Sequence, residues 1–263
     1  MRKWLLAVLA VLVLSIAACG GSKSSVTSET LPPTKATSAP TTTLPCGDAE
    51  LPPGNSLTAT AVNEGDLAIY DSPDPAAAPA RTMTNPRLIN NDPNAAVPLL
   101  FLVKDTPDTN CAYVEVYLPV RPNGSTGFVK RADVKLATNP YRIEVRLGEF
   151  NLKVYKDNTA IMDTTIAEAS DNTPTPGGLY YTTELVKTPN PSGVYGPYAY
   201  GLSGFSEVLQ TFNGGPGQLG LHGTNEPGKL GSKVSHGCIR MSNEDITTLA
   251  GMLPLGVPVQ IIA

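Results

Sequence analysis

Charged side chains are scarce in this chain of 263 residues. Asp, Glu, Lys and Arg make up only 16% of it, and its formal net charge is -4. A protein that binds nucleic acid needs a positive face that neutralises a row of phosphates. We therefore exclude this class of partner and expect no nucleic acid to bind.

Long apolar runs are absent after the N-terminus. Met1-Arg2-Lys3 and the apolar residues 4–18 are typical of a secretory signal peptide, and the run is too short for a membrane span. It ends in Ile16-Ala17-Ala18-Cys19, which resembles the lipobox of bacterial lipoproteins, whose cysteine carries a diacylglyceryl group. We expect residues 1–18 to be a signal peptide and Cys19 to anchor an exported protein to the outer face of the cell membrane. The alternative is an ordinary signal peptide cut near Ala18.

The segment that follows lacks apolar residues at regular spacing. Residues 20–45 are almost all Gly, Ser, Thr, Pro and Lys, and cannot bury enough surface to become ordered. We expect residues 19–45 to be the lipidated cysteine and a linker, which holds the folded part at a distance of about 30 Å or more from a membrane. A disordered tail without a role is the alternative.

Cysteine is rare, with four in the chain. Without Cys19, an odd number remains in an oxidising compartment: Cys46, Cys111 and Cys238. Cys46 precedes the first folded region and Cys111 begins a strand-like run inside it, so we pair these two. A loop of that size stabilises the fold by about 4 kcal/mol in the chain-entropy model. Cys238 is then a free thiol, unless it pairs with one of the other two.

Short strands separated by turn residues are expected in residues 46–138. They lie at 66–70, 97–103, 113–118 and 126–130, and their spacing predicts a small β barrel or sandwich. Residues 116–129, VYLPVRPNGSTGFV, resemble the last strands of bacterial SH3-like domains. The resemblance implies a domain that binds the cell wall or positions its neighbour. A β spacer without a ligand is the alternative.

A second, mainly β domain is expected in residues 139–263. Alternating apolar residues predict strands that pair as hairpins, at 141–147, 151–155 and 160–166. Ser242 is the expected N-cap of one helix, which has apolar residues at helical spacing and ends before Pro254. A last strand follows at 257–262.

Only two histidines occur in the chain, and both lie within the sixteen positions before Cys238. Two histidines placed at random would both fall there in fewer than about one case in a hundred. A thiol attacks as a thiolate and needs a base or positive surroundings to ionise. Gly237 lacks a side chain and lets nearby backbone N–H groups turn towards an oxyanion. The pattern predicts a cysteine nucleophile for acyl transfer.

Residues 222–241, HGTNEPGKLGSKVSHGCIRM, resemble the signature of the YkuD-type L,D-transpeptidases. The resemblance covers about residues 139–263 and includes the motif Thr175-Pro176-Gly177-Gly178. It implies a YkuD-like β-sandwich with one C-terminal helix. It also implies a role for these site residues: Cys238 as the nucleophile, His222 as the general base, Gly237 with Cys238 as oxyanion donors, Ser235 and His236 as supports of the loop, and Arg240 as a substrate-binding residue. We also expect Gly223, Tyr198 and Tyr200 to bind substrate.

The resemblance implies a role in building the peptidoglycan wall and in cell shape. Such an enzyme removes the terminal D-alanine from a stem tetrapeptide through a cysteine thioester and transfers the acyl group to an amine of another stem. With water as the acceptor it would be a carboxypeptidase. The implied partners are peptidoglycan stem peptides, with β-lactams, carbapenems above all, as covalent inhibitors. No cofactor is expected.

Each site residue also has a simpler interpretation. His236 could only hydrogen-bond the backbone, and Arg240 could pair with Glu244 or Asp245 at the helix start. A zinc site on the two histidines and Cys238 has only three ligands, so we expect no metal. The Gly-, Pro- and Tyr-rich residues 177–204 are expected to form a lid that excludes water, with loop packing as the alternative.

Two other functions remain open. One is a wall-binding lipoprotein in which the second domain is inert. The other is a thiol redox protein, for which a Cys-X-X-Cys motif is expected, and the sequence has none.

Overall fold

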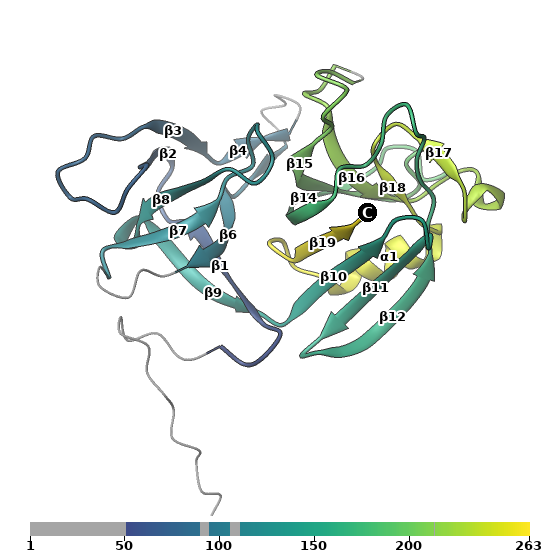
Figure 1. Cartoon of the computed structure of the whole chain (residues 1–263), viewed down its shortest axis with the longest axis horizontal. Helices are drawn as coiled ribbons and strands as arrows, with labels where there is room; N and C mark the ends of the chain where they lie inside the picture. Colours follow the sequence, from purple (N-terminus) through teal and green to yellow (C-terminus); the bar gives the residue numbers. More distant parts are fainter. Residues whose placement is uncertain (1–50, 90–94, 106–110, 213) are drawn as a thin grey trace, which may run out of the picture. The chain divides into compact units, whose positions relative to one another are not determined.

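The computed structural model describes residues 51–89, 95–105, 111–212 and 214–263 (Figure 1). These residues belong to one compact unit. The expected signal peptide, the lipidation site Cys19, the linker and Cys46 lie outside them. No helix in the described part of the chain has the length and apolar character needed to cross a membrane.

The first region is built on a five-stranded antiparallel sheet, in the order β8-β7-β6-β1-β9. Its strands are β1 (Ser56–Ala61), β6 (Leu100–Asp105), β7 (Tyr113–Tyr117), β8 (Thr126–Lys130) and β9 (Val134–Asn139). Two short hairpins complete it: β2 (Gly65–Ile69) with β3 (Arg81–Asn85), and β4 (Arg87–Leu88) with β5 (Ala96–Val97). That this region is SH3-like stays a prediction.

An apolar core holds the first region together. Alternating residues of the central strands point inwards, so that Phe101, Val114, Val116 and Val129 are fully buried. Cys111, just before β7, is disulfide-bonded. Its predicted partner lies outside the described residues, so the pairing itself stays a prediction.

The second region is an eight-stranded sheet in the order β12-β11-β10-β19-β14-β15-β16-β18. Its strands are β10 (Tyr141–Arg146), β11 (Asn151–Lys156), β12 (Thr159–Thr165), β14 (Gly178–Lys187), β15 (Tyr198–Phe205), β16 (Gln218–His222), β18 (Ile239–Arg240) and β19 (Pro258–Ile262). A small separate pair joins β13 (Glu168–Ala169) to β17 (Lys233–Ser235). The expected hairpins β10-β11 and β11-β12 are confirmed.

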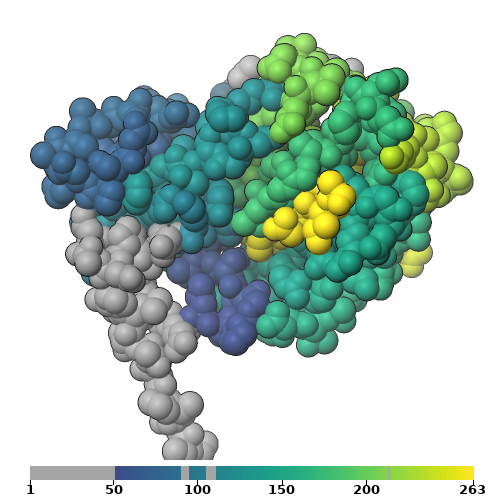
Figure 2. Space-filling model, in the orientation of Figure 1, coloured from purple at the N-terminus to yellow at the C-terminus, as the bar shows by residue number. Residues whose placement is uncertain are grey.

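The last strand lies in the middle of this sheet. β19 pairs in parallel with β10 and antiparallel with β14, and Figure 2 shows it in yellow between the teal and green residues. Helix α1 (Asn243–Met252) begins where expected, because the Ser242 side chain accepts a hydrogen bond from the Asp245 N–H at 3.0 Å. Ile246 and Leu249 bury one face of this helix. The mainly β fold with one C-terminal helix is confirmed.

The lid expected at residues 177–204 is wrong for most of its length. Most of these residues form β14 and β15, which pair antiparallel inside the sheet. The glycines mark close packing: a Cβ at Gly201 would lie 1.9 Å from Glu184 Oε1, and one at Gly204 would lie 2.3 Å from Tyr180 Cε1. Only residues 188–197 connect the two strands as a loop.

A hairpin turn of the first region holds a loop of the second. Arg121 donates hydrogen bonds to the carbonyl oxygens of Ser206 at 2.6 Å, Leu209 at 3.1 Å and Pro216 at 3.0 Å. Its guanidinium also lies 5.0 Å from the centre of the Phe205 ring. The loop between β15 and β16 is therefore fixed from outside its own region.

A small apolar cluster gives the two regions a second contact. Leu100 and Leu102 of β6 pack with Tyr181 of β14. The Tyr181 hydroxyl donates a hydrogen bond to the Tyr117 carbonyl at 3.1 Å. The first region thus meets the second both at this cluster and at Arg121.

Candidate active site

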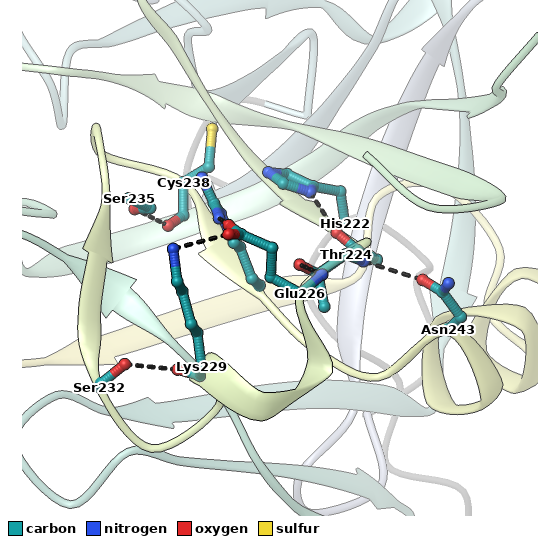
Figure 3. A network of polar contacts seen from close by, with 10 residues as sticks. His222, Thr224, Glu226, Lys229, Ser232, Ser235, Cys238 and Asn243 are labelled. Atoms are coloured by element: carbon teal, nitrogen blue, oxygen red, sulfur yellow. Dashed lines mark hydrogen bonds and ion pairs between the residues drawn. The ribbon is translucent and has the colours of Figure 1, made fainter. Parts of the chain in front are cut away.

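His222 and Cys238 lie side by side at the end of the sheet. His222 is the last residue of β16 and pairs with Arg240 of β18, which brings the loop before β18 next to the imidazole. A Cβ built on Gly220 would lie 3.6 Å from Cys238 Sγ and 4.0 Å from His222 Cδ2. Figure 3 shows the sulfur and the imidazole on the same side of the ribbon. Both line one cavity of about 350 Å³.

The imidazole of His222 is held in one orientation. Its Nδ1 lies 2.6 Å from the Gly223 carbonyl oxygen, which can only accept, so Nδ1 carries the proton and Nε2 is left as a proton acceptor. The Tyr195 ring contacts the imidazole edge to face, with 4.8 Å between ring centres. The Asn243 side chain accepts from the Thr224 N–H at 2.8 Å and ties this segment to the start of α1.

Burial keeps both reacting groups uncharged at rest. It lowers the pKa of His222 to about 4, and the charge of Arg240 acts in the same direction, whereas the bond to the Gly223 carbonyl opposes it. Burial also raises the pKa of the Cys238 thiol, although a backbone hydrogen bond from Gly220 and the charge of Arg240 oppose it. A neutral imidazole beside a thiol can take the proton as the sulfur attacks.

The loop before Cys238 is tied by side chains. Thr175 Oγ1 donates to the Gly237 carbonyl at 2.9 Å, and Ser235 Oγ donates to the Cys238 carbonyl. Gly237 has φ +126°, a conformation that favours glycine. Its N–H is already used, because it donates to Ser235 Oγ at 3.3 Å. Of the two expected oxyanion donors, only the Cys238 N–H makes no hydrogen bond to any described residue.

His236 faces a different wall of the site. Its side chain is exposed and stacks on Phe212, with 5.5 Å between ring centres. His236 therefore packs against the loop between β15 and β16.

The alternative zinc site finds no support in the geometry: within the described ranges, no three His, Cys, Asp or Glu side chains are grouped so as to hold a metal ion.

Arg240 pairs with an acid that the sequence did not indicate. Its guanidinium lies 3.4 Å from Glu226, which also pairs with Lys229 at 2.6 Å. The alternative of Glu244 or Asp245 as its partner is wrong. Arg240 does not line the cavity of Cys238, and its buried Nε has no hydrogen-bond partner among the described residues. Its role as a clamp for a substrate carboxylate stays a prediction.

The two tyrosines expected to bind substrate are partly committed to the fold. The Tyr200 hydroxyl donates to the carbonyl oxygens of Leu249 at 3.0 Å and Leu253 at 3.2 Å, so its phenol holds the end of α1. Tyr198 packs against the same apolar core. Gly223, the remaining expected contact, supplies the carbonyl that orients His222.

Four other residues at or beside the cavity were not identified from the sequence. Ile89 of the first region lines it, together with Glu184 and Gln218 of the sheet. Arg87 forms an ion pair with Glu184, although 97 residues separate them. The one available signal was Glu184 itself, a lone acid in the strand Gly178–Lys187.

An imidazole at the end of β16 and a thiol in the loop just before the neighbouring strand β18 define a cysteine–histidine site suited to acyl transfer. Residues 140–261 match the YkuD family, described as the L,D-transpeptidase catalytic domain. The proteins named YkuD in Bacillus licheniformis and Bacillus subtilis strain 168 are each 36% identical over 124 residues, which cover 47% of this chain and 67% of theirs. The chain belongs to the YkuD family of L,D-transpeptidases.

More distant similarities were also found. YbiS of Escherichia coli K12 is 50% identical over 42 residues, which are 16% of this chain and 14% of YbiS. The crystal structure of an L,D-transpeptidase from Mycobacterium tuberculosis H37Rv is 16% identical and gives a TM-score of 0.41 over 62% of this chain and 90% of that chain. A likeness at that level bears on neither the site nor the activity.

Proposed function

We propose that this protein is a cysteine-dependent peptidoglycan L,D-transpeptidase. The observation that carries the proposal is the position of Cys238 Sγ and His222, both within 4.0 Å of one point above Gly220. Membership of the YkuD family supports the same chemistry and supplies the substrate class. The site holds the nucleophile as a thiol, and the base is neutral over the whole physiological pH range.

In the first step His222 Nε2 takes the proton of Cys238 while the sulfur attacks the carbonyl of the third residue of a stem tetrapeptide. The oxyanion accepts a hydrogen bond from the Cys238 N–H. The C–N bond to the terminal D-alanine breaks, the leaving amine takes the proton from His222, and a thioester remains.

In the second step the neutral side-chain amine of another stem attacks the thioester. The C–S bond breaks, and the proton of the amine passes through His222 to the sulfur, which restores the thiol. The product is a cross-link between the third residues of two stems. Water in place of the amine would give a carboxypeptidase.

We also propose that Cys19 carries the lipid that holds the protein at the outer face of the cell membrane, facing the wall. The lipobox-like sequence Ile16-Ala17-Ala18-Cys19 supports this proposal. Labelling with a radioactive fatty acid tests it, and Cys19→Ala should remove both the label and the membrane association.

The test of the activity uses the full chain with a disaccharide-tetrapeptide and an acceptor stem, followed by mass spectrometry. We expect free D-alanine and a cross-linked product from the wild type, and neither from Cys238→Ala. A carbapenem should add its mass to the intact wild-type chain and not to that variant. Release of D-alanine by Cys238→Ala at the wild-type rate contradicts the proposal.

A further inference from the structure

A second cavity adjoins the one that holds Cys238. It has a volume of about 790 Å³ and lies where the first region meets the second, and we call it the boundary cavity. Both cavities share part of their walls, namely Ile89, Glu184, Gly215, Pro216 and Gln218. The space around the thiol therefore continues towards the first region.

The boundary cavity has a charged wall. Arg87 of β4 and Glu184 of β14 form an ion pair there, with 28% of the arginine side chain exposed and 8% of the glutamate side chain. Gln218 Nε2 donates to Glu184 Oε1 at 3.0 Å, and the Thr183 hydroxyl donates to Glu184 Oε2. The carboxylate is thus fixed from three sides, while the guanidinium is open to the cavity.

Stability alone does not account for this pair. An ion pair with a buried carboxylate adds little net stability compared with apolar side chains of the same volume, because the buried charge loses its hydration. A charged pair on the wall of a cavity of this size instead suits a ligand that carries both charges.

The first region also fixes the shared wall. The Pro216 carbonyl, which lies on the loop lining both cavities, accepts a hydrogen bond from Arg121 at 3.0 Å. Two arginines of the first region therefore contact the walls of the site: Arg121 binds the loop, and Arg87 lines the boundary cavity.

We propose that the boundary cavity binds the acceptor of the transfer reaction through an amino-acid end that carries an ammonium and a carboxylate on the same carbon. Glu184 receives the ammonium, and Arg87 receives the carboxylate. The ammonium then loses one proton to solvent, and the neutral nitrogen attacks the thioester. The cavity of Cys238 holds the donor, and the shared wall at Glu184 brings the acceptor nitrogen up to it. This inference rests on the proposed transpeptidase function.

The experiment uses the full chain, one donor and two acceptor probes. The donor is the disaccharide-tetrapeptide. The first probe is a tripeptide whose third side chain ends in an amine and a free carboxylate on one carbon, and the second has that carboxylate amidated. The variants are Arg87→Ala, Arg87→Lys and Glu184→Gln, with Arg81→Ala as the matched control on the exposed strand β3.

We expect the wild type to prefer the probe with the free carboxylate. Arg87→Ala should raise the KM for this probe by about tenfold and remove the preference, because one charge-assisted contact is lost. The KM of Arg87→Lys should lie between those of the wild type and Arg87→Ala, and the KM of Arg81→Ala should equal that of the wild type. Glu184→Gln should raise the KM for both probes, since both carry the amine. The rate of D-alanine release without an acceptor should change by a smaller factor than these KM values.

An unchanged acceptor KM in Arg87→Ala overturns the inference. So does a slower release of D-alanine with the acceptor KM unchanged, because the pair would then bind the donor. Calorimetry on Cys238→Ala, which needs no turnover, separates this failure from that of the proposed function: adding Arg87→Ala should weaken binding of the first probe by about tenfold, and equal binding overturns the inference. A wild type that releases no D-alanine contradicts only the proposed function.

Discussion

The two β regions of this chain differ in what they bury. The described core of the first region is apolar, and its buried polar residues are Thr58, Asn85 and Asn139, none of which is an acid or a base. The second region buries His222, Glu168 and Glu184 as well as an apolar core. Burying ionisable groups is unfavourable unless they are paired, so they mark the region where chemistry is expected.

Side chains of the first region also bind backbone groups of the second. Arg121 of the first region binds three carbonyl groups of the second, and Asn123 both donates to and accepts from the Phe205 backbone at 2.8 Å. The first region thus works as a support for a wall of the site. The predictions below test how far the division between support and chemistry holds.

The largest effect should follow loss of the base in the second region. His222→Gln should slow D-alanine release by about a thousandfold, because the thiol then has no proton acceptor. His236→Gln is the matched control and should lose less than about tenfold, since His236 packs on Phe212 and not on the thiol. Single-turnover kinetics measure both, and equal losses would remove the distinction between the two histidines.

Protonation of His222 should destabilise the second region at acid pH. The pKa of His222 is lowered to about 4 in the folded chain, against about 6.5 when unfolded, so the unfolded chain binds the proton more readily between these pH values. Stability is then full above about pH 6.5 and falls by about 3 kcal/mol as the pH drops to 4. Urea unfolding at pH 7 and pH 4 measures it. His222→Gln should lack this part of the loss, and an identical loss in both proteins contradicts the assignment.

Removing the Arg121 side chain of the first region should have a smaller effect, which appears in the activity of the second region. Arg121→Ala leaves the carbonyl groups of Ser206, Leu209 and Pro216 without their donor, which should destabilise the chain by about 2 kcal/mol and slow D-alanine release by about tenfold. Arg81→Ala, on an exposed strand, is the control. Thermal unfolding and initial rates measure the two effects. Full activity in Arg121→Ala would show that the regions act independently.

The smallest effect should come from a single hydrogen bond between the regions. Tyr181→Phe removes the hydroxyl that donates to the Tyr117 carbonyl but keeps the ring buried. The free energy of unfolding should fall by about 1 kcal/mol. Tyr155→Phe, on a half-buried ring, serves as the control. A loss no greater than in that control would mean that the Tyr181 hydroxyl adds nothing to the contact between the regions.

Local patterns predicted the parts of this structure that depend on near neighbours. The alternation at Tyr141–Arg146 predicted a strand that pairs as a hairpin, and the Ser242 cap predicted the start of α1. The rarity of histidine pointed to His222 and Cys238 together, because few other residues could serve a thiol as a base.

Patterns of that kind failed where packing decides the outcome. The glycines and tyrosines of β14 and β15 predicted a loop, yet Gly201 and Gly204 are small because neighbouring side chains occupy the space above them. The pairs Arg87–Glu184 and Arg121–Ser206 join residues 97 and 85 positions apart. Nothing in the local sequence specifies such contacts, because they arise only when the sheets are assembled.

The central place of β19 has a consequence for the order in which the second region folds. Nineteen residues lie between Cys238 and the start of this strand at Pro258, and the sheet cannot close between β10 and β14 until the strand has docked. Strands β10 and β14, which come earlier in the chain, therefore wait for residues 258–262 before the sheet beside the thiol is complete.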